Sequence, residues 1–435
     1  MAVVEYVEVQ SNQRLQGRRT VQLQTILNSI QKFKGFKYRR VKLERDAEGK
    51  RLLVQIEPDK RCKGRCSKCE TPGSTYDTLP ARRYQFVPLW GIPVFLLYAA
   101  RRIACQPCGK PVVEAIPWAL GKSPITRAFA WFLAAWAKRM SWQEVADAFK
   151  VSWDTVFGAV SMAVTYGLAH RKLEGIETIG VDEVSWQHGR FLTAVYQLDE
   201  SCRRLLWLGE ERKERTLNGF FDILGAAASK LRAVASDMWT PFMNVIRDRA
   251  PGALHVLDRF HIIANVHKAV DKVRAAEART LAKEGRPVLK NSRWLLLKSK
   301  GKLSDTQGDR LAELVKINLK TVRAYLLKED LRQFWDHFSW VRASIFLSGW
   351  CRRAIASRLP DMARVARTFQ AHHHLILNWF RAGGAISSGA VEGLNNKLKI
   401  VLRRSYGFRS YDSVTTALYH AMGKLPEPKF SHQFW

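Results

Sequence analysis

A single carboxylate, Asp182, interrupts a nearly continuous apolar run at 178–184. This run and the stretch 191–198 predict two β-strands, joined by a turn at His188-Gly189. Burying a carboxylate in an apolar strand costs several kcal/mol unless a metal ion or a hydrogen-bond partner compensates its charge. Asp182 is therefore either a metal ligand or a hydrogen-bonded structural residue, and the other acids of the chain decide between the two.

The elements around Asp182 follow an order typical of a ribonuclease-H-like core, which is a mixed sheet with helices on both faces. Three strands in a meander are followed by helix, strand, helix, strand and helix, at 178–184, 191–198, 203–210, 217–231, 232–236, 241–249, 253–257 and 261–279. From Arg286 to about Gly383 the pattern predicts helices only, which indicates an all-helical insertion in this core. The run His372-His373-His374 is expected to be structural or to contact phosphate, because consecutive helix residues point in different directions.

Two further acids stand where predicted strands end. Asp237 follows the buried stretch 232–236, and Asp258 follows 253–257. In a ribonuclease-H-like order the fourth strand lies beside the first, so we expect Asp237 to meet Asp182 on adjacent strands. Asp258 stays open as an auxiliary acid or as the second ligand itself.

A fourth acid, Glu392, lies in a predicted helix at 387–404. At 100° per residue the apolar side chains of this helix group on one face. Glu392 shares another face with Asn396, Lys399 and Arg403. An acid isolated among an amide and cations indicates a metal ligand with phosphate contacts beside it, although a solvated polar face would also explain the polarity.

Asp182, Asp237 and Glu392 together could hold two Mg²⁺ ions about 3.5–4 Å apart for in-line displacement at phosphorus. Hard oxygen ligands suit Mg²⁺ because they leave coordination positions open for phosphate oxygens. One ion would activate a water or a 3′-hydroxyl, and the other would stabilise the leaving 3′-oxygen. The chain has no Ser/His/Asp arrangement and no Gly-rich phosphate loop that would compete for this chemistry.

Two CxxC pairs predict a zinc site: Cys66 with Cys69, and Cys105 with Cys108. Four thiolates on two tight turns form the tetrahedral set that Zn²⁺ requires, and the long spacer is itself β-like, as in a zinc ribbon with an inserted loop. Cys62 could replace Cys66. The remaining thiols, Cys202 and Cys351, are expected to be core residues.

Two short helices joined by a tight turn are predicted between the cysteines and Asp182. Ser141 and Glu144 form a capping box for a helix at 142–149, and Ser152 caps a second helix at 153–165. This pattern, after a basic segment, indicates a helix-turn-helix that binds DNA, although any small helical hairpin gives a similar pattern. Lys138, Arg139 and Trp153 are its candidate DNA contacts.

The composition favours a globular protein of roughly two to four domains that binds a polyanion. Lys and Arg number 71 against 39 Asp and Glu, which leaves a net charge of +32 over 435 residues. Nucleic acid is the leading partner. No secretory signal opens the chain, and the longest apolar run, 87–100, is too short to span a bilayer, so we expect a cytoplasmic protein with no membrane partner.

Taken together, these motifs resemble the bacterial insertion-sequence transposases of the DDE class, in the zinc-ribbon branch known as the ISL-three (ISL3) family. The resemblance covers most of the chain from about Cys62 to Arg409 and rests on the CxxC pairs followed in order by IGVDE at 179–183, SDMW at 236–239, LDRFH at 257–261, VEGLN at 391–395 and RSYGFR at 404–409.

The resemblance implies that Asp182, Asp237 and Glu392 are the catalytic triad, with two Mg²⁺ ions, and that Cys66, Cys69, Cys105 and Cys108 hold a structural Zn²⁺. It implies cleavage of double-stranded DNA at terminal inverted repeats and joining of the 3′ ends to target DNA, by at least a homodimer on DNA. Lys138, Arg139, Trp153, Asn396, Lys399, Arg403 and Arg404 are the candidate nucleic-acid contacts.

The expected organisation is an α+β multidomain chain. The segments are an N-terminal hairpin segment, a zinc ribbon, a helix-turn-helix, a ribonuclease-H-like core in two pieces and the helical insertion, at 1–60, 61–122, 123–172, 173–282 with 384–425, and 283–383. Two alternatives are a catalytically silent DNA-binding regulator with the same modules and a nuclease of the same fold that hydrolyses without strand transfer.

Overall fold

The computed structural model describes residues 22–47, 49–298, 302–317, 319–383, 388–405 and 407–428. The chain divides into two compact units. Unit 1 extends to Arg171 and includes the stretch from Leu425, and unit 2 is Lys172–Lys424. No helix among the described residues is long and apolar enough to cross a membrane.

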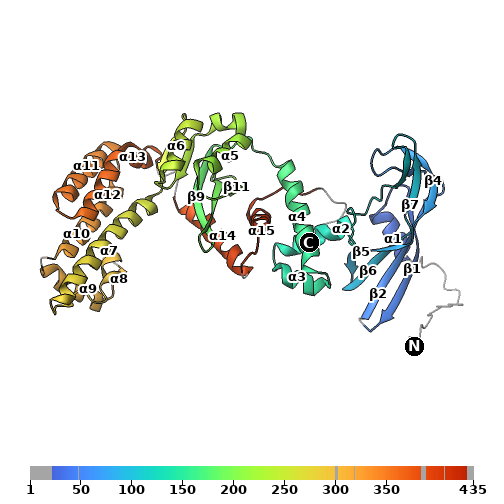
Figure 1. The fold of residues 1–435 in the computed structure, drawn as a ribbon, viewed down its shortest axis with the longest axis horizontal. Helices are drawn as coiled ribbons and strands as arrows, with labels where there is room; N and C mark the ends of the chain where they lie inside the picture. The colour runs from blue at the N-terminus through green and yellow to red at the C-terminus, as the bar shows by residue number, and fades with distance from the viewer. Residues whose placement is uncertain are drawn as a thin grey trace, which may run out of the picture. The chain divides into compact units, whose positions relative to one another are not determined.

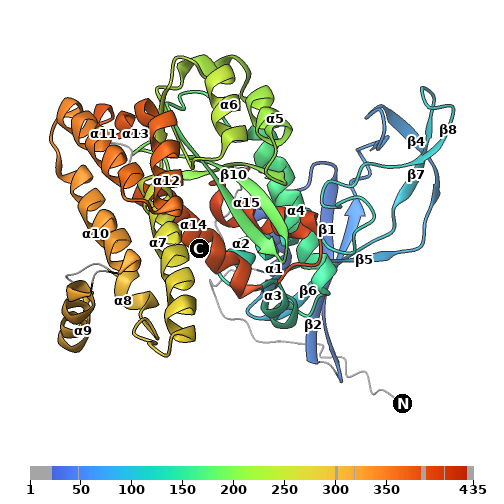
Figure 2. The same ribbon diagram turned by 60° about the vertical axis from the view of Figure 1, so that its left-hand side comes forward.

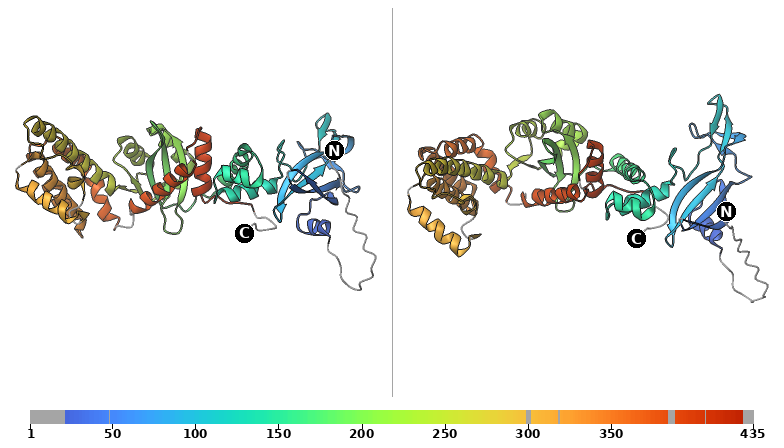
Figure 3. Two further views of the ribbon diagram at one scale, coloured as in Figure 1. Left: turned by 90° about the horizontal axis from the view of Figure 1, so that it is seen from below. Right: turned by 60° about the horizontal axis from the view of Figure 1, so that its bottom comes forward.

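Unit 1 begins with a short helix, α1 (Leu23–Ile30), against a twisted four-stranded sheet (Figure 3). The strand order is β1-β2-β6-β5, with β1 Phe36–Asp46, β2 Gly49–Pro58, β6 Ile92–Tyr98 and β5 Arg82–Leu89. The hairpin predicted within the segment 1–60 is confirmed as β1 and β2. The β5–β6 hairpin pairs in parallel with β2, so the domain boundary expected at 60/61 runs through this sheet.

A second small sheet of unit 1 carries the cysteines. Its order is β3-β4-β7-β8, with β3 Gly64–Arg65, β4 Pro72–Thr78, β7 Arg101–Cys105 and β8 Lys110–Val113. Glu114, which is buried, accepts hydrogen bonds from the Tyr98 hydroxyl and from the backbone and side chain of Arg101. This pair fixes the end of β6 to the cysteine sheet.

Three helices complete unit 1: α2 (Arg127–Ala137), α3 (Trp142–Phe149) and α4 (Trp153–His170). Both predicted caps are confirmed. Ser141 and Glu144 make the reciprocal capping box of α3, and Ser152 Oγ accepts the Thr155 backbone N–H at 3.2 Å. Lys150 ends α3 in the left-handed region at φ 51°, which turns the chain sharply into α4.

Unit 2 is built on a five-stranded mixed sheet of order β11-β10-β9-β12-β13. The strands are β9 Thr178–Gln187, β10 Arg190–Gln197, β11 Arg204–Glu210, β12 Ala233–Ser236 and β13 Leu254–Leu257. The first three are antiparallel neighbours, whereas β12 pairs in parallel with both β9 and β13. The prediction that the first and fourth strands lie side by side is confirmed.

Helices cover both faces of this sheet (Figure 1). On one face, Ile179 and Val181 pack with α5 (Glu214–Leu224) and α6 (Thr240–Arg249). Successive strand residues point to opposite faces, so Gly180 and Asp182 face α14 (Ser388–Arg404). The α15 helix (Tyr411–Met422) lies on that face too, where the Leu208 N–H donates to the Tyr419 hydroxyl at 3.0 Å; its helix was not predicted.

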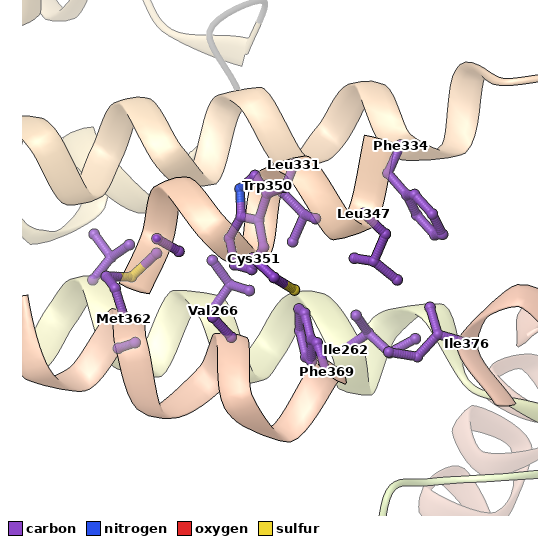
Figure 4. Close-up of a cluster of buried hydrophobic side chains, with 14 of the residues drawn as sticks. Ile262, Val266, Leu331, Phe334, Leu347, Trp350, Cys351, Met362, Phe369 and Ile376 are labelled. Carbon is purple, nitrogen blue, oxygen red and sulfur yellow. The ribbon is translucent and has the colours of Figure 1, made fainter. Parts of the chain in front are cut away.

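The stretch between β13 and α14 contains helices and no strand among its described residues, as predicted. It packs as a bundle of α7 Arg259–Lys283, α8 Arg293–Leu297, α9 Asp305–Lys316, α10 Lys320–Arg332, α11 Trp340–Ala356, α12 Pro360–Ala371 and α13 His373–Arg381 (Figure 2). Its core joins Val266 of α7 to Trp350 and Phe369, and includes Cys351, one of the two thiols expected in the core (Figure 4). The other, Cys202, is only half-buried.

Candidate active site and metal centre

Asp182 lies in the middle of the central strand β9 and is only 7% exposed. Its Oδ1 accepts the Glu183 backbone N–H at 2.7 Å, and its Oδ2 accepts the side-chain amide of Asn395 on α14. The Asn395 Oδ1 in turn accepts the hydroxyl of fully buried Tyr196, at 2.7 Å. A chain of hydrogen bonds therefore connects β10, the acid on β9 and α14.

Asp237 and Asp258 lie directly after the carboxyl ends of the parallel strands β12 and β13. The register pairs Ser236 with Leu257, and the Asp258 N–H donates to the Ser236 carbonyl at 2.8 Å, so the two acids occupy matching positions. Asp182, Asp237 and Asp258 line one small pocket, together with Val391 of α14 and Trp379 of α13. Three carboxylates from distant parts of the sequence thus converge.

Burial raises the pKa of all three carboxylates, and the charges of neighbouring acids add to the rise. Burial raises the pKa of Asp182. Burial, followed by the charges of Asp182 and Glu183, raises the pKa of Asp237 to about 6, although His261 acts against the rise. Burial also raises the pKa of Asp258. A cation in this pocket would relieve the repulsion, so the donor set fits a hard divalent metal such as Mg²⁺.

His261, on the first turn of α7, lies beside these acids. Its ring is a cationic partner for them when it is protonated. Its Nε2 lies 4.0 Å from Asp182 Oδ1 and 3.9 Å from Asp258 Oδ2. Asp258 has a second task, because its Oδ1 accepts the Phe260 N–H at 2.8 Å and so caps α7.

Glu392 is exposed on α14 and is not among the residues that line the pocket. Burial is the main cause of the raised pKa of Asp258, and the charge of Glu392 adds to it. Among the described residues, only the four cysteines bring three or more ligand atoms within 4.8 Å of one another. The carboxylates are therefore too far apart for three of them to bind one ion without moving.

The face of α14 that carries Glu392 is polar and exposed, with Asn396, Lys399 and Arg403 on it, while Arg404 is exposed further round the helix. Val391 and Leu398 are buried on the opposite side. The helix approaches β9 closely at Gly180, where an added Cβ would lie 2.8 Å from Val391 Cγ2. Glycine at this position is therefore what allows α14 to reach Asp182.

Arg212 fixes the rim of the pocket. Its guanidinium donates to both Glu183 carboxylate oxygens, with Nη1 2.6 Å from Oε1, and lies 4.4 Å from the Trp239 ring centroid. The Trp239 indole N–H donates back to the Arg212 carbonyl at 3.2 Å. These contacts tie the loop after Asp237 to β9.

The four predicted zinc ligands gather in unit 1. The Sγ atoms of Cys66 and Cys108 are 3.8 Å apart, and those of Cys69 and Cys105 are 3.4 Å apart. A tetrahedral Zn²⁺ with bonds of about 2.3 Å needs sulfur atoms about 3.8 Å apart. The cysteines therefore fit zinc. Cys62 is exposed and outside this cluster, so Cys66 rather than Cys62 completes the set of four thiols.

Comparison with known proteins decides the family. A family model described as a transposase, for the ISL3 group of the DDE class, matches residues 179–418. This chain belongs to the ISL3 family of DDE transposases. It is 28% identical over 394 residues to the transposase for insertion sequence element IS1001 of Bordetella parapertussis, covering 89% of this chain and 95% of that protein.

Two further proteins are similar to this ISL3 chain. The transposase for insertion sequence element IS1557 of Mycobacterium tuberculosis is 30% identical over 395 residues, covering 83% of this chain and 86% of that protein. The Drosophila P element transposase strand transfer complex matches with a TM-score of 0.40 and 10% identity, over 73% of this chain and 94% of that one.

Several residues around the acid pocket were not assigned a role from the sequence. Asn395 and His261 lie inside the motifs VEGLN and LDRFH, but only the structure shows that both face Asp182. Tyr196 and Arg212 carried no sequence signal, because each acts through a contact with a residue on another element.

Trp153 and Lys138, which are predicted DNA contacts of unit 1, are exposed. Trp153 is 39% exposed at the start of α4, where its ring stacks on Phe157 at 5.5 Å. Lys138 is exposed as well but forms an ion pair with Glu427. A DNA phosphate would have to compete with that carboxylate.

Proposed function

We propose that this ISL3 transposase binds the terminal inverted repeats of an insertion sequence, cleaves DNA there and joins the 3′ ends to target DNA. One observation supports this most directly: Asp182 and Asp237, from adjacent strands, line one pocket, and Asn395, one turn beyond Glu392, bonds to Asp182. We further propose that unit 2 is a ribonuclease-H-like core, since its strand order and directions match that arrangement.

Asp182, Asp237 and Glu392 would hold two Mg²⁺ ions. When bound, Mg²⁺ supplies Lewis-acid activation of the attacking water or hydroxyl and stabilises charge on the leaving 3′-oxygen. The protein orients the acids: Asn395 and the Glu183 N–H fix both oxygens of Asp182, and Arg212 holds the Asp237 loop against β9. The cationic face of α14, with Lys399 and Arg403, would contact the DNA backbone beside the scissile phosphate.

Asp258 has an auxiliary role in this proposal. Its Oδ1 is already used to cap α7, and its Oδ2 faces His261. Glu392, whose side chain is exposed on the helix bonded to Asp182, is free to turn toward a phosphate-bound ion. His261, when protonated, would instead balance the charges of Asp182 and Asp258 before metal and DNA arrive.

Unit 1 would recognise the terminal repeats. The α3 and α4 helices have the short turn and capping of a helix-turn-helix, and the zinc ribbon and the net charge of +32 would add salt-sensitive phosphate contacts. Because two ends must be joined in one reaction, we propose at least a homodimer on DNA.

End joining separates this function from its alternatives. Labelled DNA ends carrying the terminal repeats are incubated with the protein, Mg²⁺ and a supercoiled plasmid. Covalent transfer of the label to the plasmid is the expected result. Cleavage without transfer would indicate a hydrolytic nuclease, and binding without cleavage would indicate a DNA-binding regulator.

A further inference from the structure

A second pocket of unit 2 lies beside the edge strand β13. It is formed by α6, β13 and α13, and α6 and α13 lie close together in Figure 1. The two pockets share elements: His255 of β13 and Asn378 of α13 line this one, whereas Asp258 after β13 and Trp379 line the acid pocket.

All titratable side chains that line the second pocket are basic: Arg247, His255, His372, His374 and Arg381. Arg247 is paired with its neighbour Asp248 at the surface, at 2.8 Å. No described carboxylate pairs with Arg381, whose guanidinium lies 5.2 Å from the Trp340 ring centroid. No acid lines the pocket, so Arg381 presents positive charge there without a carboxylate partner among the described residues, whereas Arg247 shares its charge with Asp248.

Only two of the three consecutive histidines at 372–374 line this pocket. His373 faces away, with Nε2 3.4 Å from Ser348 Oγ on α11, whereas His372 and His374 line the pocket. His255 forms the floor and is 8% exposed. Its Nε2 bonds to Ser236 Oγ at 2.8 Å, and its carbonyl accepts the Asn378 amide at 2.7 Å.

These contacts hold the pocket in a fixed relation to the acids, because Ser236 directly precedes Asp237. Planar guanidinium groups and imidazoles around a rigid, acid-free hollow are the groups that proteins use to bind phosphate oxygens. Metal binding by the same histidines has no support, since their ligand atoms do not form a cluster within 4.8 Å among the described residues.

We infer that the pocket between α6, β13 and α13 binds a phosphate group, and, resting on the proposed function, that the backbone of DNA lying across the acid pocket supplies it. Arg381 would supply the charge, Arg247 would add to it by exchanging Asp248 for the phosphate, and His372 and His374 would supply hydrogen bonds. A free nucleotide offers the same chemistry and is the other source of that phosphate.

The test compares two double variants of the full chain with the same change of charge. Arg247→Gln with Arg381→Gln removes the pocket arginines. Arg352→Gln with Arg367→Gln, on exposed positions of α11 and α12 outside the pocket, is the matched control. Binding to a labelled duplex is measured over a series of salt concentrations, and binding of ATP without DNA is measured by equilibrium dialysis.

Each lost phosphate contact lowers the slope of log K against log salt by about 1. We expect the pocket variant to lose about 1 to 2 in slope relative to the control variant, and His374→Gln to lose part of this. Saturable ATP binding that only the pocket variant loses would assign the phosphate to a nucleotide. Equal slopes in the two double variants, with no ATP binding by the intact chain, would overturn the proposal.

Discussion

Asn395 on α14 donates its side-chain amide to Asp182 on β9, across 213 positions of sequence, while accepting the Tyr196 hydroxyl. An amide is suited to this place because it donates to the acid with one atom and accepts from the phenol with the other. The hydrogen bond fixes the position of α14 along β9. It therefore sets where Glu392 stands relative to the buried acid.

Removing this bond should reduce cleavage more than DNA binding. We expect Asn395→Ala to lower the single-turnover cleavage rate by about 10- to 100-fold, as loss of a residue that orients a metal ligand usually does. Asn395→Asp should be worse, because it places a second negative charge against Asp182. Ile400→Ala, on the exposed side of α14, is the control. Equal rates for all variants would show that the bond has no role in positioning.

The close approach at Gly180 makes a second prediction. An added Cβ would lie 2.8 Å from Val391 Cγ2, so Gly180→Ala should displace α14 and destabilise unit 2 by about 1–3 kcal/mol. Shortening the neighbour with Val391→Ala should restore part of the cleavage rate in the double variant. Thermal melting and cleavage are measured together, and a double variant no better than Gly180→Ala alone would contradict the packing argument.

Zinc removal should disrupt unit 1 without altering the acid pocket. We expect about one zinc per chain by elemental analysis, because a closed four-thiolate site binds one ion. Cys69→Ser should lose that zinc and the binding of terminal repeats, whereas Cys202→Ser, outside the cluster, should keep both. Retention of zinc in Cys69→Ser would contradict the assignment.

His255 should make unit 2 less stable in acid. Burial, with His374 and His372 nearby, lowers its pKa from 6.5 to about 4. The unfolded chain then binds a proton that the folded chain does not, so this stability is present above pH 6.5 and is lost as the pH falls toward 4.

The loss attributable to His255 between about pH 7 and pH 5 is about 2 kcal/mol. His255→Gln cannot titrate, so its melting temperature should change less over that range than that of the intact chain. Arg247 and Arg381 line the same pocket, together with His372 and His374. Identical pH dependence in both proteins would show that His255 is not the titrating group.

The sequence predicted the sheet better than the contacts around it. Element order alone placed β9 beside β12, because connection rules leave few arrangements for such an order. The register of α14 on β9 could not be predicted, since it depends on the space at Gly180 and on the Tyr196 hydroxyl, which belong to other elements. The β5–β6 hairpin was predicted as strands, but its pairing with β2 is non-local.

The most direct test of the central proposal is nicking of supercoiled DNA that carries paired terminal repeats, in Mg²⁺. The intact chain is compared with Asp182→Ala, Asp237→Ala, Asp258→Ala and Glu392→Ala, and with Asp222→Ala on the outer helix α5 as control. We expect the Asp182, Asp237 and Glu392 variants to bind DNA but not nick it, while Asp258→Ala retains reduced activity. Nicking by the Glu392 variant together with none by the Asp258 variant would make Asp258 the third ligand and contradict the proposed triad.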